Sequence, residues 1–464
     1  MTRKENLGIE VALDVCLTNP EDLEECLDRL KEFVWPYAGM LYRRELRGHC
    51  EDFIRGLLSD LSRKSTEPIA ERAGKHRRGL QRFIGAADWD HVPLIDKMCQ
   101  HVVDEIGSPE AVLAIDPSAF TKKGKASVGV TRQWCGRTGQ VENCQLGVFL
   151  GYISQKGRTL VDTRLFLPRE WTTDEVRREL CHIPKSIKYK TTCELALNLL
   201  RERRGSLPHA WIAADAEFGR SQNFRAALRQ MNERYILATE PRQRIREAYP
   251  AKLEGQRRTA PIMNAFQFKD GLAAEDWKRV EVRAGAKGPI VVWAARVQVQ
   301  ATLRQRTDKA VEWLLIIRTE AQEPEYRYYM SNADGEISLE AMVSAAAARW
   351  GIEDCFERAK GRVGLGHCEA RSWTGWHHHV TLSLLSLWFL VLEQKRIGSR
   401  TPAITLQQSA EAIGELLRDP QMDVRKLAGR ITHRLRRNEE ARLNHWRRAV
   451  RTEKLRAPLI KVAQ

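Results

Sequence analysis

Apolar residues near the start of the chain recur at the spacing of a helix. Leu23, Cys26, Leu27 and Leu30 fall on one helical face, and a second such set begins at Phe53. The pattern predicts an α-helical N-terminal region over residues 1–105.

From residue 106 the pattern changes to short apolar runs separated by polar turns, which is typical of strands. Residues 112–115 predict a buried strand that ends at Asp116, and residues 210–214 predict another that ends at Asp215. The other elements predicted here are a hairpin of strands 127–134 and 143–152, a helix over 173–204 broken near Pro184, a helix over 221–233 and a strand over 235–238. We therefore expect an α/β unit over residues 106–239.

The second half of the chain divides into three parts. Residues 240–335 are rich in predicted strands, at 280–282, 290–302, 311–319 and 326–330. Residues 336–395 predict one long helix over 339–363 and an apolar helix over 379–395. Residues 396–464 form a basic tail: from 431 onward, ten Lys/Arg stand against three Glu.

Composition narrows the function. With 43% hydrophobic and 29% charged residues, the chain of 464 residues is globular, which excludes a mainly disordered protein. Its net charge of +16 (76 Lys+Arg against 60 Asp+Glu) favours a polyanionic partner, DNA first, with RNA or another acidic polymer as the alternative. The longest apolar run, 380–392, is too short to span a bilayer, so we expect no membrane association and a cytoplasmic protein. Ten scattered cysteines without a Cys-x-x-Cys pair argue against disulfides and a cysteine zinc site.

A basic stretch over residues 63–82 is a candidate DNA-binding element. A helix start at Pro68, a break at Gly74 and a new helix from Arg77 have the spacing of a helix-turn-helix. Arg77 and Arg78 would then contact DNA. A solvated basic helical hairpin is the alternative.

Three acidic residues are candidates for catalysis. Asp116 and Asp215 each follow a wholly apolar run, and strands of one open sheet present such residues at their carboxyl ends, where sites form. A helix cap is the alternative for either residue alone. In the predicted helix 339–363, the positions of Arg349, Glu353, Phe356 and Lys360 share a stripe about 60° wide. A surface ion pair between Arg349 and Glu353 is the alternative there.

At these positions the sequence resembles the DDE transposases of the insertion-sequence-701 group. The resemblance rests on three blocks: residues 114–118, 122–134 and 139–145; residues 214–219; and residues 349–353 with Lys360, 364–365 and 371–376. The related insertion-sequence-4 group carries a Tyr-x2-Arg-x3-Glu-x6-Lys signature. Arg349, Glu353 and Lys360 fit that spacing, whereas Ala346 stands at the tyrosine position.

The resemblance implies a fold and an activity. It implies a ribonuclease-H-like catalytic core interrupted by a β-rich insertion (240–335), with Asp116, Asp215 and Glu353 as catalytic metal ligands. Two Mg²⁺ ions, replaceable by Mn²⁺, suit an all-carboxylate set and would support both phosphodiester hydrolysis and 3′-hydroxyl strand transfer. A catalytically silent transposase descendant, acting as a repressor or architectural DNA-binding protein, is the alternative.

Partners follow from the same resemblance. We expect the protein to bind double-stranded DNA, at transposon terminal inverted repeats and at target sites, as a homodimer. The resemblance also implies a bacterial protein that is associated with the nucleoid. Beside Arg77 and Arg78, the cations expected to contact DNA are Arg349 and Lys360 near the scissile bond, Lys122, Lys123 and Arg132 in the first block, and Arg447 and Arg448 in the tail. A solvated charge run is the alternative for the two lysines.

Two weaker patterns stay open. Consecutive His377, His378 and His379 could bind zinc, although neighbouring helical residues point about 100° apart. Trp293, Trp313 and Tyr328 could stack on a flipped base or could be ordinary buried strand aromatics.

Overall fold

The computed structural model describes residues 14–136, 138–248, 260–285, 288–303 and 306–460. Its N-terminal part is helical, as predicted. The helices are α2 (Glu21–Glu24), α3 (Cys26–Ala38), α4 (Arg44–Leu58), α5 (Thr66–Arg72), α6 (Arg77–Gly85) and α7 (Val92–Ile106). The break at Gly74 between α5 and α6 is confirmed.

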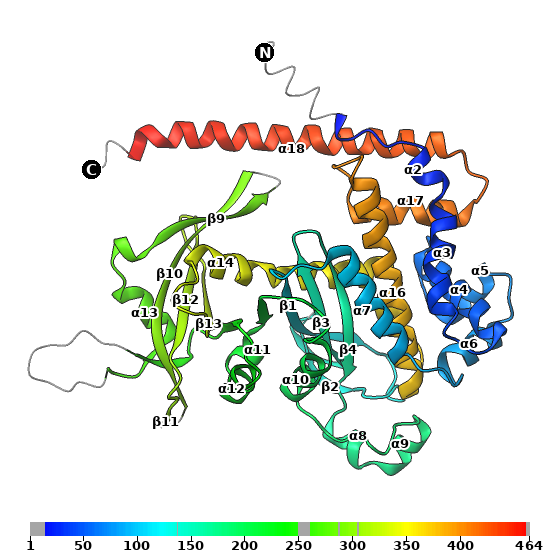
Figure 1. Cartoon of the computed structure of the whole chain (residues 1–464), viewed down its shortest axis with the longest axis horizontal. Helices are drawn as coiled ribbons and strands as arrows, with labels where there is room; N and C mark the ends of the chain where they lie inside the picture. The colour runs from blue at the N-terminus through cyan, green and yellow to red at the C-terminus, as the bar shows by residue number, and fades with distance from the viewer. Residues whose placement is uncertain (1–13, 137, 249–259, 286–287, 304–305, 461–464) are drawn as a thin grey trace, which may run out of the picture.

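One mixed sheet forms the centre of the molecule (Figure 1). Its first six strands are β1 (Val112–Thr121), β2 (Thr131–Cys135), β3 (Gln140–Ser154), β4 (Gly157–Leu165), β5 (Trp211–Ala214) and β6 (Tyr235–Thr239). Strands β1, β5 and β6 run parallel, while β3 lies antiparallel to β1 and also pairs with β2 and β4. The predicted strands of residues 106–239 and their hairpin are therefore confirmed, although the first hairpin strand begins at Thr131 rather than at residue 127.

Two details of this sheet differ from the prediction. Strand β1 does not end at Asp116, because its antiparallel pairing with β3 continues to Thr121. Only the parallel pairing with β5 stops at Ile115. Strand β4 was not predicted, because polar residues at Arg158, Thr159 and Asp162 mask its apolar pattern.

The β-rich segment continues the same sheet. Its strands are β7 (Arg244–Glu247), β8 (Met263–Asn264), β9 (Lys278–Gly285), β10 (Gly288–Leu303), β11 (Arg306–Thr307), β12 (Glu312–Thr319) and β13 (Tyr326–Ser331), with helix α13 (Ala265–Phe268) and 3₁₀ turns at Lys269–Gly271 and Ala274–Asp276. The four predicted strands are confirmed. Because β13 pairs antiparallel with β6, the segment is hydrogen-bonded directly to the central strands.

A buried ion pair joins this segment to the central unit. Arg225 Nε of α12 (Gln222–Gln230) donates to Glu312 Oε1 of β12 at 2.8 Å, and both side chains are 0% exposed. The Tyr235 hydroxyl of β6 also donates to Glu312. Burying a charge is costly unless it is paired and hydrogen-bonded, so these contacts favour one docking of the β-rich segment.

The remaining helices cover the sheet and extend beyond it. They are α8 (Arg169–Thr173), α9 (Glu175–Leu180), α10 (Thr192–Arg203), α11 (Ala216–Gly219), α14 (Leu339–Ala348), α15 (Trp350–Arg362), α16 (Trp373–Gly398), α17 (Leu406–Arg418) and α18 (Val424–Ile460), with a 3₁₀ turn at Leu365–His367. The predicted single helix 339–363 is wrong, because it is broken at Arg349 into α14 and α15. The Ile352 N–H donates to the Arg349 carbonyl, a three-residue step that tightens the turn there.

Helix α16 is the central helix of the hydrophobic core. The apolar run 380–392 lies inside it, and its side chains are almost all buried between the sheet and the N-terminal helices. In the part of the chain that the structure describes, no helix is both long enough and apolar enough to cross a membrane. The tail forms the long helix α18, which Figure 1 shows crossing one side of the molecule from the N-terminal helices toward β9.

Candidate active site

The three predicted acids meet in one pocket. Asp116 lies on β1, Asp215 follows β5, and Glu353 lies in the first turn of α15. All three line a pocket of about 960 Å³. The fold therefore brings together residues from three distant parts of the chain.

Parallel strand pairing places the two aspartates side by side. Ile115 of β1 is in register with Ala214 of β5, and the next residue of each strand is an aspartate. Asp215 also caps α11, because its Oδ1 accepts a hydrogen bond from the Glu217 N–H at 3.0 Å. The helix-cap explanation is therefore correct for Asp215 as well, and it fixes the direction of this carboxylate.

Burial and neighbouring carboxylates raise the pKa of both aspartates. Burial, followed by the charge of Asp215, raises the pKa of the Asp116 carboxyl to about 8, although Arg349 opposes the shift. Burial, followed by the charge of Glu217, raises the pKa of Asp215. Crowded carboxylates with raised pKa values disfavour further negative charge, so a cation placed between them would be stabilised.

Close packing seats α15 on the sheet. A Cβ added at Gly351 would lie 3.0 Å from Ile153 Cγ2 of β3, so a larger residue there would push the helix outward. Arg349 Nη2 donates to Glu353 Oε1 at 2.8 Å, which is the ion pair that the sequence left open. Phe356 and Lys360 line the same pocket as Glu353, so three of the four positions of the predicted stripe lie together. Arg349 precedes α15 at the break from α14 and is not among the residues that line the pocket.

The donor set suits a hard divalent cation, because all three side chains offer carboxylate oxygens. Among the described residues, however, no three Asp, Glu, His or Cys side chains are gathered closely enough to hold an ion as they stand. Glu353 is instead paired with Arg349. The three side chains therefore have the right chemistry for a metal ion. For all three to bind it, Glu353 would have to leave Arg349 and turn toward the ion.

The pocket also contains residues that were not predicted from the sequence. Glu217 lies two residues after Asp215 and accepts a hydrogen bond from the Thr192 hydroxyl. Trp134 and Tyr189 contribute aromatic rings to the pocket wall. Glu217 and Trp134 both stand inside the sequence blocks that carry the resemblance, which was the available signal.

Comparison with known proteins now decides the family. A family model described as DDE superfamily endonuclease matches residues 23–307, more than half of the chain. The chain belongs to this family. The match includes Asp116 and Asp215 and ends before Glu353, whose assignment depends on its place in the pocket.

A curated relative agrees with the resemblance seen in the sequence. A probable transposase for insertion sequence element IS701 from Microchaete diplosiphon is 27% identical over 191 residues. The aligned part covers 39% of this chain and 46% of the relative, so the chain spans about half the length of the protein it matches. The resemblance to insertion-sequence transposases of the DDE superfamily is thus confirmed.

The cations predicted near the acidic pocket lie in different surroundings. Lys360 lines the pocket, with its ammonium 5.1 Å from the centroid of the Phe120 ring. Arg132 is exposed on β2, and Lys123 is exposed in the loop after β1. Lys122 is half-buried and donates to the Cys368 carbonyl, so its ammonium ties this loop to the segment before α16.

The cations predicted in the terminal helical regions are exposed. Arg77 pairs with Glu67 on the surface at 2.5 Å, and Arg78 is exposed on the same helix. Arg448 is exposed on α18, whereas the side chain of Arg447 lies outside the described part of the chain.

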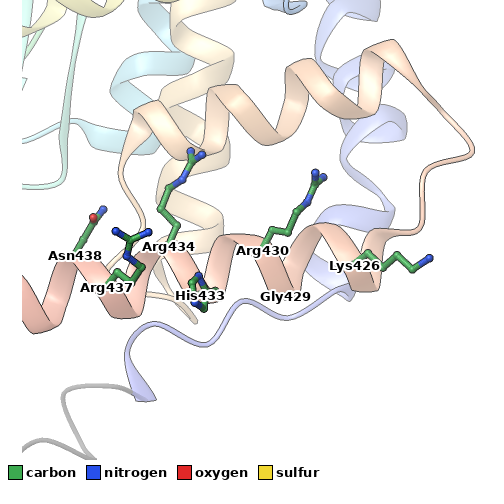
Figure 2. Close-up of a pocket in the computed structure, with 7 residues that line it drawn as sticks. All are labelled: Lys426, Gly429, Arg430, His433, Arg434, Arg437 and Asn438. Atoms are coloured by element: carbon green, nitrogen blue, oxygen red, sulfur yellow. The ribbon is translucent and has the colours of Figure 1, made fainter.

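Helix α18 carries a second basic feature, a concave basic surface that encloses a volume of about 850 Å³ and lies nearer the start of the helix than Arg448. Figure 2 shows Arg430 and Arg434 pointing from α18 toward α17. Glu415 and Glu411 of α17 accept from these two arginines. The surface is lined by Lys426, Gly429, Arg430, His433, Arg434, Arg437 and Asn438.

The two weaker patterns have structural explanations. His377, His378 and His379 are buried, and each has a ring nitrogen 2.8–3.0 Å from a backbone carbonyl. In the β-rich segment, Trp313 donates its indole N–H to Ala333 O, and Tyr328 is buried. Trp293, Trp313 and Tyr328 are not among the residues that line the acidic pocket.

Proposed function

We propose that this protein is a DNA transposase that cuts at the ends of an insertion sequence and joins the freed 3′-hydroxyl to target DNA. The observation that carries the proposal is the meeting of Asp116, Asp215 and Glu353 in one pocket. Membership of the DDE superfamily endonucleases supports it, as does the similarity to a probable insertion-sequence transposase.

In this proposal Asp116, Asp215 and Glu353 hold two Mg²⁺ ions, for which Mn²⁺ can substitute. When bound, the ions activate the attacking water or 3′-hydroxyl and stabilise the departing oxygen. The protein contributes the fixed direction of the Asp215 carboxylate and the burial of the Asp116 carboxyl. If Glu353 turned to bind a metal, Arg349 would lose its partner and its guanidinium would be available to donate hydrogen bonds to a DNA phosphate.

The finer description of the fold belongs to the same proposal. The central strands follow the order β4-β3-β1-β5-β6, with β5 and β6 parallel to β1, which is the arrangement that a ribonuclease-H-like core requires. In that description the strands β7–β13 are the insertion between the second and third acids. The N-terminal helices, with Arg77 and Arg78, and the basic surface of α18 bind the DNA backbone. A homodimer would bring two DNA ends together.

Cleavage of a plasmid that carries the gene with its flanking DNA tests the proposal. With Mg²⁺ or Mn²⁺, we expect cuts at the element boundaries, and we expect Asp116→Asn, Asp215→Asn and Glu353→Gln to abolish them while DNA binding persists. Asp354→Asn is the matched control: it removes the neighbouring carboxylate on α15, which pairs with Arg158 at 2.7 Å and does not line the acidic pocket. Normal cleavage by any of the first three variants would show that its assignment is wrong.

One observation favours a second candidate function. The three carboxylates are not gathered around a common point, and Glu353 is engaged by Arg349, as would also be found in a silent, DNA-binding descendant. Specific binding to the flanking DNA without cuts, with either metal, would support that alternative.

A further inference from the structure

Trp134 is an exposed tryptophan at the mouth of the acidic pocket. It lies on β2, the edge strand of the sheet, and its side chain is 64% exposed. Trp171, Trp376 and Trp388, in contrast, are fully buried. A large indole left in water beside a candidate active site marks a surface on which another planar group can stack.

The hairpin around Trp134 is held in place rather than loosely attached. Trp134 is in register with Val141 of β3, which is itself 51% exposed, so the two form one apolar patch. The neighbouring Gln133 side chain donates to the Cys144 carbonyl at 3.0 Å. Asn143 donates to the Lys122 and Gly124 carbonyls at 2.6 and 2.9 Å. The indole is therefore presented by a fixed backbone, which reduces the entropy lost on binding.

The charges around the pocket decide what the occupant is. Carboxylates line its acidic wall, at Asp116, Asp215, Glu217, Glu240 and Glu353. Cations accompany them: Lys360 and Arg220 line the pocket, and Arg132 shares the exposed face of β2 with Trp134. Arg169 lies 4.6 Å from the centroid of the Tyr189 ring. A basic rim with an aromatic face is the combination that holds single-stranded nucleic acid, phosphates outward and bases on the ring.

We infer that Trp134 stacks on an unpaired base of the DNA strand that enters the acidic pocket. The inference rests on the proposed function and adds to it the kind of DNA that the site accepts: a strand separated from its complement at the scissile end. Duplex DNA buries its bases, so Trp134 would have no base face to meet unless the end is opened. The exposed indole acts in binding and positioning, and no chemical step is assigned to it.

Binding measurements without metal test the inference separately from cleavage. The probes are a blunt duplex and the same duplex with a short single-stranded 3′ extension that contains 2-aminopurine. We expect the wild-type protein to prefer the extended probe by about tenfold and to quench the 2-aminopurine fluorescence. Trp134→Ala should remove both effects, and Trp134→Phe should keep most of the preference.

The matched control is Trp35→Ala, which removes an equally exposed tryptophan, 71% exposed on α3, outside the pocket. This variant should keep the preference and the quenching, and circular dichroism should show native folding for all three variants. The inference is overturned if the wild-type protein has no preference or if Trp134→Ala retains it. If Trp134→Ala instead weakens self-association in sedimentation and leaves DNA binding unchanged, the tryptophan belongs to a protein interface, which also overturns the inference. Absence of metal-dependent cleavage with a Trp134-dependent preference intact would refute the transposase proposal alone.

Discussion

A single added methyl group at Gly219 should separate the positioning of Asp215 from the presence of its carboxylate. Gly219 ends α11, the short helix that Asp215 caps, and its N–H donates to the Asp215 carbonyl at 3.0 Å. A Cβ at this position would lie 1.8 Å from the Ala238 carbonyl oxygen of β6. Real Cβ contacts do not fall below 3.0 Å, so 3.0 − 1.8 = 1.2 Å of movement is required. The obstacle is strand backbone, so α11 must move instead.

The expected effect of Gly219→Ala has two parts. Overpacking of this kind costs about 1–3 kcal/mol of unfolding free energy. A displacement of Asp215 by about 1 Å would lower the rate of plasmid cleavage by about 100-fold, although every acid is still present. Urea unfolding followed by circular dichroism gives the first quantity, and the cleavage assay with Mg²⁺ gives the second.

Gly361→Ala is the control for this prediction. Gly361 lies in α15, the helix of Glu353, and a Cβ there would meet nothing within 4 Å. Alanine is favoured over glycine inside a helix by about 0.5–1 kcal/mol, so this variant should be slightly more stable than the wild type and fully active. If Gly219→Ala unfolded within about 0.5 kcal/mol of the wild type and cleaved normally, the close approach of α11 to β6 would be refuted.

Two further predictions concern stability. Glu312→Gln should lower the unfolding free energy by about 3–5 kcal/mol, because it leaves the buried Arg225 without an opposite charge. The control Glu320→Gln, which breaks the surface pair with Arg279, should lower it by less than about 1 kcal/mol. Similar losses for the two variants in urea unfolding would contradict the burial argument. Burial, followed by the charge of a nearby arginine, lowers the pKa of Lys64 from 10.5 to about 8. As the pH rises, the folded state therefore loses this proton before the unfolded state does. The unfolding free energy of the wild type, relative to that of Lys64→Met, should consequently rise by about 3 kcal/mol between pH 8 and 10.5. A difference that is constant over this pH range would show that the ammonium is not buried as described.

Local sequence patterns determined the kind of element and the residues of interest. Apolar spacing was sufficient for the N-terminal helices, for the β2–β3 hairpin and for the strands of the β-rich segment, because helices and half-buried strands have distinct periods. The position of an aspartate directly after a short apolar run was sufficient to single out Asp116 and Asp215. Their role as metal ligands stays a prediction.

Element ends depended on partners that are distant in the chain. The strand containing Asp116 runs on to Thr121 because β3 continues to pair with it, and nothing between residues 112 and 121 encodes that partner. The helix predicted over 339–363 breaks at Arg349, and its two halves pack on different strands: α14 contacts β9 and β6, whereas α15 contacts β4 and β3. Strand β4 escaped prediction because its polar residues face partners that only the fold supplies, such as Arg203, which donates to Asp162 at 2.6 Å.

The sequence by itself determined which acids, cations and aromatic residues the chain has to offer, and on which elements they lie. Only the tertiary structure decided which of them meet: it joined Asp116 to Asp215 through parallel strand register, and it placed Glu353 beside them by close packing of α15 on β3. It also turned Lys122 to a backbone carbonyl and left Trp134 exposed at the pocket mouth. The physical reason is that secondary structure depends on neighbours along the chain, whereas a site depends on contacts that form only when distant segments are packed together.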